Sequence, residues 1–282
     1  MLSSLEPLLP WQFSPTVLTA VLVAVIVYRR GASRTGPPLA TRYRVAFHLG
    51  LLLIYAALQT SWEYYASHMF FVLRLQHFVL HGLAPALLTG AMPGAALARG
   101  LPRRLQTPIG AIRRALRGPL HLLQNPAIAV ALYLLGLLIW LWPPLSTYVM
   151  VSNWLFRAMS WSVLATALPF WSLVLDARAH PLARARPGCR LVMLYLAMLA
   201  MVLTSASLTL AQRDWYPVYA VCGRFLPVPP VADQQLGGVV MWIFGSALFG
   251  TVFFTVLGRN LEHEEAATVP AAAAAAAAQH GT

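Results

Sequence analysis

Long apolar stretches recur along the chain and are separated by shorter polar segments. An apolar run of about 20 residues can cross the hydrocarbon core of a bilayer as an α-helix. A helix also satisfies its own backbone hydrogen bonds, which lipid cannot do. The pattern therefore predicts an all-α polytopic membrane helix bundle with about seven transmembrane helices, at residues 11–28, 45–62, 68–90, 126–143, 155–175, 190–211 and 235–257.

Composition supports a bundle in lipid. Hydrophobic residues make up 59% of the 282 residues and charged residues only 10%, whereas a soluble domain carries about 25% charge. The formal net charge is +12 and every basic residue is Arg, a balance that can indicate a nucleic-acid partner. Because most of the arginines collect in a few segments between apolar runs, we expect the lipid bilayer as a partner and no nucleic acid.

The charge of the connecting segments predicts the orientation. Segments that follow the first, third and fifth apolar runs are rich in Arg, whereas the segments between them carry no basic excess. Basic loops stay in the cytoplasm, so we expect the N-terminus outside and the C-terminus inside. On this interpretation residues 1–260 form the bundle and residues 94–125 form a basic cytoplasmic loop. Residues 261–282 form a low-complexity Ala-rich tail, as a frayed helix or as disorder.

In the basic loop 94–125, Arg alternates with Leu and Ile, as in RRLQTPIGAIRRALRG. Two interpretations remain open for it. It can lie along the membrane surface with its bases on anionic headgroups, or it can be a basic tether that only enforces the topology.

The third apolar run, SHMFFVLRLQHFVLHGLAP, contains a cation and several imidazoles. His77 and His81 are four residues apart and Arg74 is three before His77, so the three project from one face of a helix. His68 is nine residues before His77, about half a turn away from that face. Ionisable groups at such depth usually mark a site or pathway, although membrane histidines also serve as structural hydrogen-bonding groups between helices.

These residue types point to a soft metal ion. Neutral imidazole binds copper and zinc, and Cu(I) also accepts thioether sulfur. We therefore predict copper as the ligand and name His77, His81, His68 and Met69 as candidate ligands. Met193, Met198, Met201 and Met241 lie in later runs, where Met more often fills gaps in packing.

An acidic partner is expected for Arg74. Its cation repels a metal ion, so we expect it to pair with an acid, and Glu63 is the nearest candidate in sequence.

The segment 211–238 leads into the seventh helix. Asp233 is placed to cap that helix, and Gly237 and Gly238 allow close helix approach. A lid over the histidine cleft is the alternative role for this segment.

Four segments give the chain a family resemblance: HMFFVLRLQHFVLHGLAPALL, LPFWSLVLD, WYPVYAVCGR and DQQLGGVVMWI. In this order they resemble the CtaG-like cytochrome c oxidase assembly proteins, a seven-span family of bacterial membrane proteins. The resemblance implies a non-enzymatic factor of the bacterial inner membrane that works with cytochrome c oxidase subunits and aids copper delivery. It maps the family's histidines onto His77, His81 and His68, with Met69 beside His68. Where the family often carries further histidines, this chain has Leu73 and Gly82.

Three other functions were weighed. A haem-binding cytochrome-like protein needs histidines on facing helices, and His48 is the only other candidate in a span interior. A transporter or channel would use Arg74 and the histidines to line a path, but no repeated, broken halves are evident. A hydrolase is disfavoured because no carboxylate lies within a predicted span.

Overall fold

A computed structural model describes residues 14–34, 40–176, 178 and 184–279, with side chains as far as Glu262. Every longer element in this part of the chain is a helix, as the sequence predicts. In chain order the helices are α1 (Pro15–Ala32), α2 (Thr41–Gln59), α3 (Trp62–His68), α4 (Phe70–His77), η2 (Phe78–Leu83), α5 (Ala84–Gly90), α6 (Gly94–Gly100), α7 (Arg103–Ala115), α8 (Arg117–Leu122), α9 (Pro126–Leu138), η3 (Ile139–Leu141), α10 (Pro143–Met150), α11 (Asn153–Val174), α12 (Pro187–Thr209), α13 (Val218–Cys222) and α14 (Pro230–Gln279).

The described residues contain four helical segments that are long and apolar enough to cross a membrane, fewer than the seven expected. They are Pro15–Ala32, Phe70–Gly90, Pro187–Thr209 and Pro230–Glu262, and a fifth arises if Pro126–Leu141 and Pro143–Met150, which meet at 73°, form one bent span. The remaining two predicted spans fold as the helices α2 and α11. Both are diluted by polar positions: α2 opens with Arg42 and Arg44, and α11 carries Arg157. The number seven and the orientation remain predictions.

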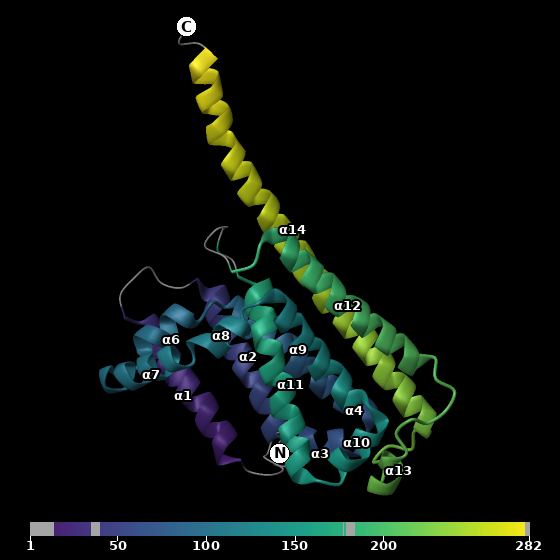
Figure 1. The fold of residues 1–282 in the computed structure, drawn as a ribbon. Coiled ribbons are helices and arrows are strands. Elements are labelled where there is room, and N and C mark those ends of the chain that lie inside the picture. The colour runs from purple at the N-terminus through teal and green to yellow at the C-terminus, as the bar shows by residue number, and fades with distance from the viewer. Residues whose placement is uncertain (1–13, 35–39, 177, 179–183, 280–282) are drawn as a thin grey trace.

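The segment Phe70–Gly90, which contains η2 between α4 and α5, is the innermost of these candidates. Of the residues in its most apolar stretch, 67% are buried inside the structure, whereas the corresponding fraction for Pro15–Ala32 is 17%. Its polar residues therefore face protein and not lipid. α14 packs along both α4 and α12, while α9 packs on α11 (Figure 1). α2 packs on α5. Gly238 on α14 permits the close approach to α12 that the sequence predicts, since a Cβ atom there would lie 2.8 Å from the Ser205 carbonyl oxygen.

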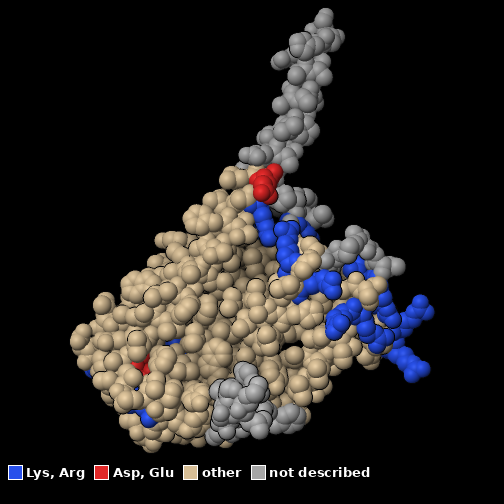
Figure 2. Space-filling view, turned by 180° about the vertical axis from the view of Figure 1, so that it is seen from behind, with Lys and Arg blue, Asp and Glu red and all other residues tan. Residues whose placement is uncertain are grey.

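The basic segment 94–125 folds as three short helices, α6, α7 and α8, beside α1. α6 crosses α1 at Gly31 and Gly100, where an added Cβ atom would collide with the backbone of the other helix. α7 has no buried residue. On the face shown in Figure 2, Arg side chains gather at one end of the molecule. The predicted orientation depends on this uneven distribution of Arg, because basic segments stay in the cytoplasm.

α14 is the longest helix and its backbone continues as far as Gln279, through the Ala-rich segment (Figure 1). The sequence favours a frayed helix or disorder there, and the described backbone is helical. The division at residue 260 into bundle and tail remains a prediction.

Candidate functional site

The histidine-bearing helix begins at a cap supplied by α14. The chain breaks at Met69, whose backbone is extended (φ −137°, ψ 129°), and restarts as α4 at Phe70. The Phe70 amide donates to Asp233 Oδ2 and the Phe71 amide to Asp233 Oδ1, each at 3.0 Å. Asp233 is fully buried, and Arg224 Nε also contacts its Oδ2 at 3.4 Å. The expectation that Asp233 caps its own helix is wrong, because its side chain reaches across to α4.

The helix widens where the second histidine lies. Phe78–Leu83 forms a π-helical turn between α4 and α5. Pro85 has no N–H to give to the His81 carbonyl, four residues earlier, and Trp171 Nε1 of α11 donates to that carbonyl instead, at 2.9 Å. The turn contains both His81 and Gly82 and ends two residues before Pro85. Single π-helical turns inside α-helices are frequent at functional sites.

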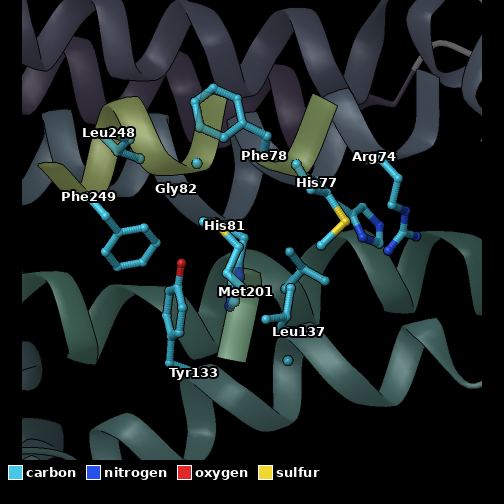
Figure 3. A pocket seen from close by; sticks show the side chains of 14 residues that line it. Arg74, His77, Phe78, His81, Gly82, Tyr133, Leu137, Met201, Leu248 and Phe249 are labelled. Carbon is cyan, nitrogen blue, oxygen red and sulfur yellow. The ribbon is translucent and has the colours of Figure 1, made fainter. Parts of the chain in front are cut away.

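His77 and His81 line one cavity of about 40 Å³ in the centre of the bundle. Their exposed fractions are 7% and 5%, and the Nε2 atom of each has no hydrogen-bond partner. The His81 ring stacks on Tyr133 of α9, with centroids 3.9 Å apart and planes at 13°. Figure 3 shows this stack and places the His77 imidazole beside Arg74. The predicted inward-facing pair is therefore present.

Two methionines complete the polarisable lining of the cavity. Met201 of α12 and Met241 of α14 both line it, although we expected from the sequence that both would mainly fill gaps in the packing. Two glycines leave the room that the cavity occupies. A Cβ atom on Gly136 would lie 3.2 Å from His81 Nε2, and one on Gly245 would collide with Met201 Sδ. The spacing of residues along one helix could not identify these partners, because they come from three other helices.

The two other candidate ligands lie away from the cavity. His68 Nδ1 lies 2.7 Å from the Tyr64 carbonyl oxygen and 2.9 Å from Ser67 Oγ. Met69 is fully buried in the apolar core and does not line the cavity. Among the described residues, no group of three or more His, Cys, Asp or Glu side chains is placed to hold a metal ion. Any metal site here would need the methionine sulfurs, or a ligand from outside the chain.

Arg74 does not pair with Glu63, which corrects the sequence expectation. The Arg74 side chain is 1% exposed, its guanidinium carbon lies 5.0 Å from the Phe70 ring centroid, and its Nε and Nη2 have no hydrogen-bond partner. Glu63 instead lines a separate hollow with Arg157. Burial raises the pKa of the Glu63 carboxyl, and the Arg157 charge opposes that rise. The α3–α4 break separates Glu63 from the histidine face.

The size and lining of the cavity limit which ligands it can bind. About 40 Å³ accommodates an ion or a few water molecules, and a haem is far larger. No Asp, Glu, Ser or Cys is among the residues that line it. The lining offers neutral nitrogen and sulfur donors next to one cation.

Comparison with known proteins gives one match. The model of a family described as cytochrome c oxidase caa3 assembly factor matches residues 20–262. No curated protein and no solved structure matches the chain.

Proposed function

Since the chain belongs to the cytochrome c oxidase caa3 assembly factor family, we propose that it holds Cu(I) transiently in the histidine cavity and passes it to a subunit of a haem–copper oxidase. The copper ion is cargo in this proposal, and the protein performs no chemical conversion. The observation that carries it is the pair of unpartnered, buried Nε2 atoms of His77 and His81 in one cavity.

Buried polar atoms without partners cost free energy. A buried nitrogen that forms no hydrogen bond costs about 1–3 kcal/mol. The fold leaves two such atoms at one place, each within a few residues of the π-helical turn. A guest that accepts their lone pairs would recover this energy. This supports a role in binding over a purely structural role, in which the histidines would bond to other helices.

The donor set suits Cu(I) better than a harder ion. Imidazole nitrogen and thioether sulfur are neutral, soft ligands, and Cu(I) accepts both. His77, His81, Met201 and Met241 supply two of each around the same cavity. Mg²⁺ and Ca²⁺ prefer carboxylate and carbonyl oxygen, and the cavity lining has no carboxylate.

Arg74 favours release of the ion. It lines the cavity together with both histidines and pairs with no acid in the described chain. Two like charges 4 Å apart repel by about 4 kcal/mol where the effective dielectric constant is about 20. The arginine therefore weakens retention of a cation, which suits delivery and not storage.

The predicted orientation places His77 and His81 in the outer half to the middle of the membrane. Oxidase copper centres lie at or above that half, so the ion would travel a short distance. On the face shown in Figure 2, most of the visible Arg lies toward one end of the molecule, which supports an orientation with that end in the cytoplasm. Reporter fusions in the α2–α3 connection test it: a cytoplasmic location there would overturn delivery from the outer side.

The central test is a copper titration of the purified full-length protein. We expect wild type to bind about one Cu(I), measured anaerobically against a chromogenic Cu(I) chelator, and His77→Ala/His81→Ala to bind none. His68→Ala is the matched control, because His68 lies outside the cavity, and it should bind as wild type does. Absence of binding in all three proteins would overturn the copper proposal and leave an assembly role without metal.

The cellular test separates delivery from binding. A strain whose only copy is His77→Ala/His81→Ala should assemble a haem–copper oxidase with a reduced copper content, and added copper should partly restore it. A fully copper-loaded oxidase in this strain would contradict the delivery proposal, even if the purified protein binds Cu(I).

A further inference from the structure

A second hollow lies at the junction of α1 and α2, away from the histidine cavity. It has a volume of about 600 Å³ and is lined by Tyr28, Arg29, Arg30, Ala32, Ser33, Arg44 and His48. Three of these seven residues are arginines and none is acidic. We propose that it binds the phosphate headgroup of an anionic phospholipid.

The three arginines of the hollow are available to bind an anionic ligand. None of the ion pairs found among the described residues involves Arg29, Arg30 or Arg44. Arg29 and Arg30 lie in the last turn of α1 and Arg44 in the first turn of α2. Guanidinium groups bind phosphate oxygens through paired N–H donors. The hollow is thus a concentration of donors suited to an anion.

Tyr28 provides an independent sign of a ligand. Its side chain is 1% exposed, and its hydroxyl has no hydrogen-bond partner. The ring is fixed by stacking on Phe47, with centroids 3.9 Å apart and planes at 18°, and it meets the edge of His48 at 5.7 Å. A buried hydroxyl held in this way and left without a partner is free to donate to a phosphate oxygen.

His48 adds a hydrogen-bond acceptor to the hollow. Its Nδ1 lies 2.7 Å from the Arg44 carbonyl oxygen, which can only accept, so Nδ1 carries a proton. Nε2 of the neutral ring then has a lone pair, and it can accept a hydrogen bond from a hydroxyl of the lipid headgroup. The hydrogen bond also fixes the ring to the same turn of α2 that presents Arg44.

An adjoining apolar groove distinguishes a lipid from free phosphate. The groove runs along α2 and shares Arg44 and His48 with the basic hollow. Its walls include Val45, Leu49 and Leu52, whose side chains are 56%, 42% and 59% exposed. A charged hollow that continues into an exposed aliphatic groove matches a phosphate head with an attached acyl chain. Inorganic phosphate would use only the first part.

The hollow between α1 and α2 differs from the basic surface formed by the arginines of α7. The arginines of α7 lie on a helix without buried residues, so they form no enclosed site. Arg29→Gln/Arg44→Gln and Arg103→Gln/Arg104→Gln therefore remove equal charge from a hollow and from an open surface. All four positions are exposed, so neither pair should prevent folding.

The test is native mass spectrometry of the full-length protein in a neutral detergent, with phosphatidylglycerol added. We expect wild type and Arg103→Gln/Arg104→Gln to retain one lipid equally. Arg29→Gln/Arg44→Gln should bind it at least about tenfold more weakly, because each basic residue near an anionic headgroup contributes a factor of about five. Tyr28→Phe, which keeps the stacked ring, should show a smaller loss.

Three outcomes would overturn the proposal. Equal weakening in both arginine pairs would show general attraction to a basic surface. Equal retention of phosphatidylcholine would show that the groove binds acyl chains without regard to charge. Displacement of the lipid by millimolar inorganic phosphate, which cannot fill the groove, would show a simple phosphate site.

Discussion

Asp233 and Phe70 are joined across 163 residues by a 3.0 Å hydrogen bond from the Phe70 amide to the Asp233 carboxylate. Through this bond the first turn of α14 fixes the start of the helix that carries His77 and His81. The carboxylate is fully buried and is shared with the Phe71 amide and with Arg224. The position of the histidines therefore depends on contacts far from them in sequence.

Asp233→Ala should lower the free energy of unfolding by about 2–4 kcal/mol, because it leaves the Phe70 and Phe71 amides without their acceptor and removes the closer of the two carboxylates that contact Arg224. Thermal unfolding in detergent measures this. Asp214→Ala is the control: Asp214 also contacts Arg224, at 3.9 Å, but its side chain is 21% exposed. An equal loss in the two variants would contradict the special role of the cap.

Gly136→Ala should reduce Cu(I) binding by filling the space beside His81. Its Cβ atom would lie 3.2 Å from His81 Nε2 and would also collide with Thr166 Oγ1. The expected result is a loss of copper together with some loss of stability. Gly250→Ala in α14 is the matched control, since a Cβ atom there meets nothing within 4 Å. That variant should keep its copper and gain about 0.5–1 kcal/mol of stability from better helix propensity.

Arg74→Gln should strengthen Cu(I) binding, by tenfold or more if only about 1.4 kcal/mol of repulsion is relieved. Arg74→Lys keeps the charge and should bind as weakly as wild type does. Competition with a Cu(I) chelator measures both affinities. Weaker binding in Arg74→Gln than in Arg74→Lys would mean that the arginine holds an anionic partner of the metal.

The Asp176–Arg178 pair predicts a pH dependence of stability. Burial raises the pKa of the Asp176 carboxyl, but hydrogen bonds from the Arg178 side chain and from the Arg178 and Arg184 amides outweigh it, so the pKa is lowered overall. A carboxyl whose pKa is lower in the folded state stabilises the fold at pH values above its unfolded pKa of about 3.9. This stabilisation is lost as the pH falls through the folded pKa.

Asp176→Asn should accordingly be less stable than wild type at pH 6–7, and the difference should vanish in strong acid. Unfolding followed at a series of pH values measures it. Arg178→Gln, which removes the side-chain donor and keeps the carboxyl and its backbone hydrogen bonds, should show a smaller loss over the same pH range. A difference that stays constant down to strong acid would show that the carboxylate charge is not responsible.

Sequence patterns predicted the helices and the inward histidine face because both depend on local periodicity. His77 and His81 share a face by spacing alone, and Gly238 was placed at a close crossing that the structure confirms. The family resemblance was confirmed over residues 20–262. These features can be inferred without knowing which helices are neighbours.

The features that depend on neighbours could not be predicted. The partner of Asp233 is on α4, and Arg74 is separated from Glu63 by the break at Met69. Met201 was one of several methionines in the apolar runs, and only the packing of α12 selects it for the cavity. The span count depends on how much polarity a membrane helix tolerates, and α2 and α11 are less apolar than the four candidate spans.

The indole of Trp171 couples two parts of the bundle mechanically. Because the carbonyl that it holds belongs to His81 itself, a shift of α11 along its axis pulls on the backbone beneath one imidazole, while the other imidazole stays anchored through α4. Such a shift would change the separation of the two rings. In the proposed function, a partner protein that moves α11 would thereby change how tightly Cu(I) is held.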